Sequence, residues 1–191
     1  MKKDSMLIMS YAIILLLIIV SIFTKYIYPI DHAVYHFIQN NTIEFRLHNY
    51  LSIVSFIFSP LHTVFLIGII FIGLYFYNKQ HFLPYLIFTI TALITGTLLK
   101  YIIQRPRPSD LIEGFSFPSL HTLILFVALF VLLALYNTYI VKWISSILII
   151  SMMCSRIYLN AHFFSDTVAS LIIVHLVYLT VNKILERHPL S

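Results

Sequence analysis

The length and number of the apolar runs in this chain limit the folds that are open to it. A run of about 20 apolar residues is long enough to cross a hydrocarbon core of roughly 30 Å as an α-helix. Backbone polar groups find no water inside a bilayer, so such runs must be helical. Hydrophobic residues make up 60% of the chain, charged residues 10%, and the mean hydropathy is +0.95. We therefore predict an all-α integral membrane protein with a single domain over residues 1–191.

The apolar runs predict six transmembrane helices. The first run follows Lys2 and Lys3 and lacks a small-residue cleavage site, so we interpret it as a retained span rather than a signal peptide. Pro60 lies inside the second run and is expected to kink that helix. The six predicted spans cover residues 7–23, 51–77, 82–103, 117–136, 140–153 and 167–184.

Residues 30–50, between the first and second spans, are more polar than the runs on either side. Their apolar residues recur at helical spacing, which predicts a short interfacial helix lying on the membrane surface. His32 and His36 are spaced as two metal ligands on a helix would be, but no third ligand of obvious geometry accompanies them. Interfacial polar residues are therefore the favoured interpretation, and zinc is the weaker one.

The segment from Ser155 to Asp166 carries groups that can take part in catalysis between two apolar runs. If a helix begins near His162, the spacing of four residues puts Asp166 on the same helix face. The Asp166 carboxylate could then accept the Nδ1–H of the imidazole and leave Nε2 as a nucleophile. On this segment alone, a His–Asp pair that only satisfies buried polarity is an equally weighted alternative.

A second polar segment, residues 100–121, lies on the same side of the membrane because two predicted spans separate it from residues 155–166. Three cations from the two segments can neutralise the oxygens of a phosphoryl group, and backbone N–H groups at a helix start can add to this site. One imidazole can attack phosphorus while the other protonates the leaving oxygen. This equipment predicts phosphoryl transfer without a metal. Its members are Lys100, Arg107, Ser119, His121, Arg156, His162 and Asp166.

These segments resemble the membrane branch of the type 2 phosphatidic acid phosphatase family, relatives of the vanadium haloperoxidases. The family pattern is Lys-x6-Arg-Pro, then Pro-Ser-Gly-His, then Ser-Arg-x5-His-x3-Asp. Leu120 stands where the family has glycine, and this is the one departure from the pattern. The matching residues are Lys100 with Arg107 and Pro108, then Pro118, Ser119 and His121, then Ser155, Arg156, His162 and Asp166.

The resemblance implies a role for each matched position. His162 is expected to form a phosphohistidine intermediate with Asp166 orienting it, and His121 is expected to be the general acid. Neither a metal nor another cofactor is implied. The residues that the resemblance assigns to phosphate binding are Lys100, Arg107, Ser119, Leu120 and Arg156.

The expected function is that of a membrane lipid phosphatase acting on a lipid (di)phosphate in the cell envelope, with undecaprenyl diphosphate as the favoured substrate. Phosphatidylglycerophosphate or phosphatidate is the alternative substrate. A lipid-phosphate binder without catalysis is the alternative function, which Leu120 encourages. The basic residues are scattered between the spans and form no stripe, so nucleic acid is not expected as a partner and the lipid bilayer is.

The basic residues predict the orientation only after the bases assigned to the site are set aside. Each side of the predicted bundle has six Lys or Arg residues. Discounting Lys100, Arg107 and Arg156 leaves six on the side of the termini against three, namely Lys25, Arg46 and Arg105. This count predicts cytoplasmic termini and an active site that faces outward.

Overall fold

A computed structural model of the chain describes residues 2–187, and within that range all the regular structure is α-helical. The predicted domain, residues 1–191, extends beyond the described residues at both ends. The helices are α1 (Lys2–Phe23), α2 (Tyr28–Glu44), α3 (His48–Ile57), α4 (Pro60–Tyr77), α5 (Lys79–Ile103), α6 (Leu120–Leu135), α7 (Tyr139–Tyr158) and α8 (Phe164–Arg187).

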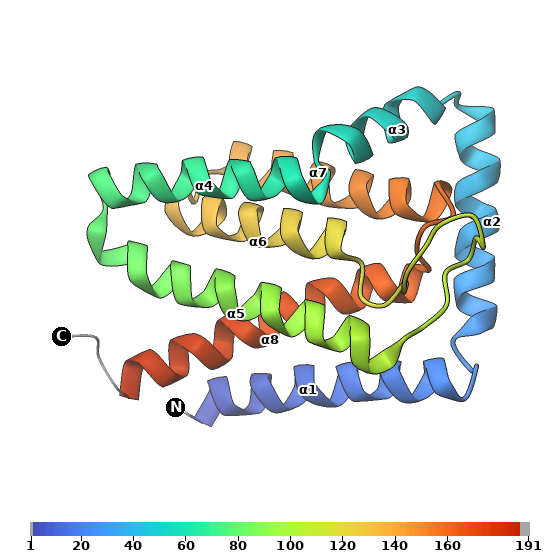
Figure 1. Cartoon of the computed structure of the whole chain (residues 1–191). Coiled ribbons are helices and arrows are strands. Elements are labelled where there is room, and N and C mark those ends of the chain that lie inside the picture. The colour runs from blue at the N-terminus through green and yellow to red at the C-terminus, as the bar shows by residue number, and fades with distance from the viewer. Residues whose placement is uncertain (1, 188–191) are drawn as a thin grey trace.

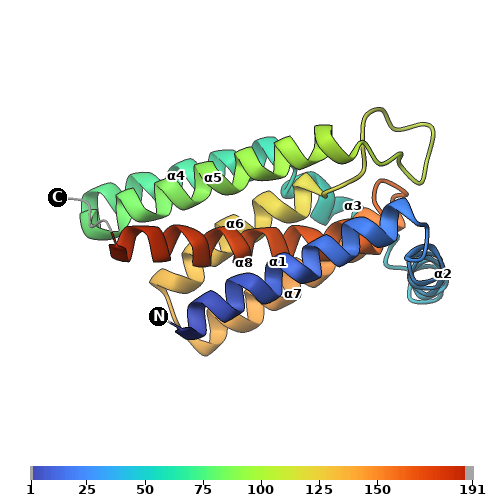
Figure 2. The ribbon, with the colours of Figure 1, turned by 90° about the horizontal axis from the view of Figure 1, so that it is seen from below.

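The long helices lie side by side as a bundle, and α2 runs across one end of it (Figure 1). Figure 2, turned by 90°, shows α2 end-on beside the same end of the bundle. The loop between α5 and α6 and the short connection between α7 and α8 reach this end, whereas the start of α1 and the end of α8 lie at the other end (Figure 1). The polar segments 100–121 and 155–166 therefore meet under α2.

Five helices are long and apolar enough to cross a membrane: α1 from Asp4, α4, α5, α7 and α8. This finding supports the predicted multi-pass membrane protein. Helix α6 has 16 residues and a length of roughly 24 Å, which is short for a hydrocarbon core. It contacts α4, α5, α7 and α8. Because these helices surround α6, its length need not equal the thickness of the hydrocarbon core. The sixth crossing and the surface position of α2 stay predictions.

The predicted second span, residues 51–77, is two helices and not one kinked helix. Helix α3 ends at Ile57, and α4 begins at Pro60 after Ser59, whose hydroxyl accepts a hydrogen bond from the His62 N–H at 3.5 Å. Proline lacks an N–H and its ring clashes with the carbonyl four residues earlier, so it suits the first position of a new helix better than a helix interior. The interfacial segment is also divided: α2 ends at Glu44, and α3 begins at His48.

Other helices differ from the prediction at their ends. Helix α7 continues to Tyr158, so Ser155 and Arg156 belong to its last turns. Helix α8 begins at Phe164, two residues after His162. The hydrophobic core lies around α6, where α5, α6 and α8 pack closely. At Gly96 in α5, a Cβ atom would lie 2.5 Å from a methyl carbon of Leu123, so glycine permits this approach.

Candidate active site

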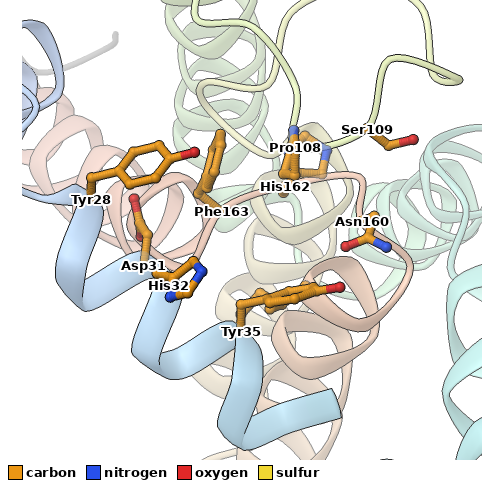
Figure 3. Close-up of a pocket in the computed structure, with 10 residues that line it drawn as sticks. Tyr28, Asp31, His32, Tyr35, Pro108, Ser109, Asn160, His162 and Phe163 are labelled. Carbon is orange, nitrogen blue, oxygen red and sulfur yellow. The ribbon is translucent and has the colours of Figure 1, made fainter.

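A cavity of about 330 Å³ opens between α2, the α5–α6 loop and the connection from α7 to α8 (Figure 3). In the close-up, the labelled side chains of α2 face the two loops, and His162 lies behind Pro108 (Figure 3). Among the residues predicted for the site, His162 is the one that lines this cavity. The lining residues are Tyr28, Asp31, His32, Tyr35, Pro108, Ser109, Ile157, Asn160, His162 and Phe163.

The contacts of His162 fix the proton on its imidazole ring. The side chain is buried, and its Nδ1 lies 2.7 Å from the carbonyl oxygen of Ser116. A carbonyl oxygen can only accept a hydrogen bond, so Nδ1 is the donor and Nε2 keeps its lone pair. The structure thus gives His162 the tautomer that a nucleophilic Nε2 requires.

Asp166 does not make the hydrogen bond to His162 that the sequence predicts. Its Oδ2 lies 3.8 Å from Nδ1 and instead accepts the Phe163 N–H at 2.9 Å, while its Oδ1 accepts from Arg105 at 2.7 Å. The physical reason is local: His162 precedes the start of α8, so the helical spacing of four residues does not apply to it. The carboxylate still acts on the imidazole through its charge at this distance.

Arg107 lies beside the free nitrogen of His162. One terminal nitrogen of its guanidinium lies 3.5 Å from Nε2 and donates to the Ala161 carbonyl at 2.9 Å, and its Nε donates to the Glu113 carbonyl at 3.0 Å. Partial burial lowers the pKa of the guanidinium, and the Asp166 carboxylate opposes that shift. Arg107 is therefore a fixed cation next to the atom that would attack phosphorus.

The two other predicted cations are held by neutral oxygens. Lys100 donates to the Phe115 carbonyl at 2.7 Å, and Arg156 donates to the Ser55 hydroxyl at 2.6 Å. The Nε of Arg156 is buried and finds no acceptor among the described residues. An anion that enters the site could accept a hydrogen bond from this buried cationic donor.

Ser119 and His121 stand at the start of α6. Ser119 is fully buried, donates its N–H to the Asp166 carbonyl at 3.3 Å and accepts from the Thr122 hydroxyl at 3.1 Å. His121 is half-buried and lies within electrostatic range of His162 and of the cations Lys100, Arg107 and Arg156. The fold thus gathers the predicted imidazoles, hydroxyl, carboxylate and cations at one end of the bundle.

Leu120 directs its side chain into the hydrophobic core. One of its methyl carbons would lie 3.6 Å from a Cβ atom placed on Gly96 of α5, and the side chain does not line the cavity. The phosphate-binding role predicted for Leu120 would therefore fall to its backbone N–H, which lies in the first turn of α6 where the helix itself supplies no acceptor.

Comparisons with known proteins identify the family of this chain. The sequence profile of the PAP2 superfamily matches residues 80–188. The chain belongs to the PAP2 superfamily. The matched region contains every residue predicted for the site, from Lys100 to Asp166, and confirms the resemblance drawn from the motifs. No curated protein sequence matches the chain.

Two solved structures share the fold of this PAP2 superfamily member. A transmembrane PAP2 type phosphatidylglycerolphosphate phosphatase from Bacillus subtilis has a TM-score of 0.77 and 23% identity, covering 95% of this chain and 96% of that one. LpxE from Aquifex aeolicus has a TM-score of 0.65 and 21% identity, covering 79% of this chain and 93% of that one. At these identities the likeness concerns the fold.

Several residues that hold the PAP2 motif residues in place were not predicted from the sequence. Arg105, which the charge count treated as an ordinary surface base, is buried between Asp31 of α2 and Asp166 of α8, at 2.7 Å from each. Ser55 of α3 supports Arg156. The run Arg-Pro-Arg-Pro was the available signal for Arg105, whereas nothing in the sequence pairs Ser55 or Asp31 with the motifs.

The weaker zinc interpretation concerned His32 and His36. Their Nε2 atoms lie 3.1 Å apart and share a hydrogen bond on the exposed side of α2. Among residues 2–187, the structure contains no group of three or more His, Cys, Asp or Glu side chains that could hold a metal ion.

Proposed function

We propose that this PAP2 superfamily member is a membrane lipid phosphatase that hydrolyses a lipid (di)phosphate through a phosphohistidine on His162. The observation that carries the proposal is the hydrogen bond from His162 Nδ1 to the Ser116 carbonyl, which leaves Nε2 unprotonated beside Arg107. A buried imidazole held in this tautomer next to a fixed cation is suited to attack a phosphorus atom.

In the first step, Nε2 of His162 attacks the terminal phosphorus, and the bond from that phosphorus to the leaving oxygen breaks. The leaving oxygen is the bridging oxygen of a diphosphate or the ester oxygen of a monophosphate. The electron pair of that bond goes to the leaving oxygen, and His121 supplies the proton that neutralises it. In the second step, His121 takes a proton from water as the water oxygen attacks the phosphohistidine. Inorganic phosphate leaves, and both imidazoles return to their starting states.

The three cations suit this reaction because none of them is neutralised by the contact that holds it. Lys100, Arg107 and Arg156 donate to carbonyl or hydroxyl oxygens, so their positive charges remain available to a phosphate group. Guanidinium groups bind phosphate oxygens in pairs and in a fixed geometry. The N–H groups at the start of α6, near Ser119 and Leu120, would add donors to the same group.

Asp166 would stabilise the positive charge that develops on His162 during the attack. It acts on the ring across 3.8 Å and also positions the neighbouring backbone by accepting the Phe163 N–H. Its role therefore differs from that of a carboxylate that sets the tautomer, because the Ser116 carbonyl already does so.

Undecaprenyl diphosphate is the proposed substrate, and phosphatidylglycerophosphate is the second candidate. The second candidate is supported by the fold, which is similar to that of a phosphatase named for this lipid. Both present a phosphate group on a lipid to the same side-chain equipment. The proposed setting is the outer face of the cell membrane, with both termini in the cytoplasm. Arg105 is buried in an ion pair, so it too is set aside when Lys and Arg residues are counted for orientation. Six such residues then lie on the side of the termini and two on the side of the active site.

Detergent-purified protein given a panel of polyprenyl diphosphates and phospholipid phosphates tests the proposal. We expect phosphate release that persists in a chelator. We also expect an acid-labile phosphate on His162 when His121→Ala is given an aryl phosphate, whose leaving oxygen needs no proton from His121, and is then quenched. His162→Gln should abolish both signals. Phosphate release without any phosphoenzyme would favour direct attack by water. Activity that is lost in a chelator and restored by a divalent ion would overturn the metal-free steps. Tight lipid binding without turnover would establish the alternative function, a lipid-phosphate binder without catalysis.

A further inference from the structure

A buried ionic network joins α2 to the start of α8 beside His162. Arg105 donates to Asp31 of α2 and to Asp166 of α8, each at 2.7 Å, and also to the Ser165 hydroxyl at 2.7 Å. The exposed fractions of Asp31, Arg105 and Asp166 are 2%, 6% and 0%. One guanidinium therefore bridges two carboxylates that come from helices far apart in the sequence.

Asp31 also binds the first turn of α8 directly. Its Oδ1 accepts the Ser165 N–H at 2.8 Å, and its Oδ2 accepts the Ser165 hydroxyl at 2.8 Å. The first N–H groups of a helix have no partner within the helix, and a carboxylate there also interacts favourably with the helix dipole. Asp31 thus caps α8 from another helix.

The network surrounds the residue that follows His162. The Phe163 ring lies under the Arg105 guanidinium, with its centroid 3.9 Å from Cζ, and the Phe163 N–H donates to Asp166. Because Arg105 holds Oδ1 of Asp166, Oδ2 is the oxygen that faces Nδ1 of His162 at 3.8 Å.

We propose that Asp31 is a positioning residue for the nucleophile, an inference that rests on the proposed phosphohistidine mechanism. By occupying one side of Arg105, Asp31 prevents the guanidinium from forming a two-pronged pair with Asp166, which would draw Oδ2 away from the imidazole. Among the described residues, the Asp31 carboxylate accepts hydrogen bonds from Arg105 and Ser165 and from none of the predicted phosphate-binding side chains. Its loss therefore acts on the attack rather than on phosphate binding.

The test compares Asp31→Asn with Gln39→Met. Gln39 is a matched control because it also fastens α2 to the bundle, by donating to the Tyr158 carbonyl at 2.8 Å, but it has no contact with the network. We expect Asp31→Asn to lower kcat about 100-fold with KM within about twofold, as a misplaced reacting group does. Gln39→Met should keep kcat at the level of the unmodified protein.

A double-mutant cycle with Asp166→Asn separates positioning from a general structural effect. If Asp31 acts through Asp166, then adding Asp31→Asn to Asp166→Asn lowers kcat no further. Equal losses in both backgrounds would overturn the inference, as would an unchanged kcat in Asp31→Asn or an equal loss in Gln39→Met.

If Asp31→Asn does not fold, Arg105→Lys takes its place, because lysine keeps the charge but cannot bridge two carboxylates in the same planar geometry. It should show the same loss of kcat at unchanged KM, and a kcat equal to that of the unmodified protein would overturn the inference. The unmodified protein also separates the two ideas. Its failure to form a phosphoenzyme would refute the proposed function, whereas a working enzyme that is indifferent to both substitutions would refute only the role of Asp31.

Discussion

Replacing Asp166 by asparagine removes one charge beside His162 while the tautomer of the ring stays as it is. A carboxylate at 3.8 Å stabilises a full positive charge on the imidazole by about 4 kcal/mol at an effective dielectric constant of about 20. Arg105 offsets part of this stabilisation, since it lies 2.7 Å from the other carboxylate oxygen. About 3 to 4 kcal/mol corresponds to a loss of roughly 100- to 1,000-fold in kcat.

The variant should remain folded because Arg105 keeps its pair with Asp31. Steady-state kinetics measures the loss, and ¹⁵N NMR of the imidazole reports whether the proton stays on Nδ1 of His162. Asp110→Asn, which removes an exposed carboxylate from the α5–α6 loop, is the control and should leave kcat unchanged. A proton that moves to Nε2 in Asp166→Asn, or an unchanged kcat, would refute the reasoning from charge and distance.

Three further predictions follow from the same geometry. Burial lowers the pKa of His162 from its ordinary 6.5 to about 4. The neutral imidazole therefore contributes fully to the stability of the fold above pH 6.5, and this contribution is lost as the pH falls towards 4. An NMR titration of His162 with a midpoint near 6.5 would contradict the prediction. Leu120→Gly should lower the free energy of unfolding by about 2 kcal/mol, because the leucine side chain packs in the core. The same change should leave the ratio of kcat/KM between bulky and small phosphate esters unchanged. Denaturation measures the first effect and steady-state kinetics the second, and a changed ratio would place the side chain at the cavity. In a Cys154→Ser background, a cysteine at Glu113 should react with an impermeant reagent in intact cells and one at Asn78 only after lysis, and the reverse pattern would turn the site towards the cytoplasm.

The sequence by itself determined the class of fold and the family. The apolar runs are as long as a bilayer requires, and this physical match makes helical spans readable without any tertiary information. The order and spacing of the motif residues from Lys100 to Asp166 established the family, and counting the crossings between the two segments placed them on the same side. These inferences depend on the local residue pattern and on whether the number of membrane crossings between two segments is even or odd. Both can be read from the linear sequence.

The tertiary structure alone decided how the site is held. The partner that sets the tautomer of His162 is the backbone carbonyl of Ser116. Every residue has a backbone carbonyl, so no pattern of side chains in the sequence predicts this hydrogen bond. The pairing of Asp31 with Arg105 joins residues on two helices that meet only in the folded bundle. A sequence shows which groups are present, but a hydrogen bond depends on distances of about 3 Å between atoms, and those distances are fixed by how the helices pack.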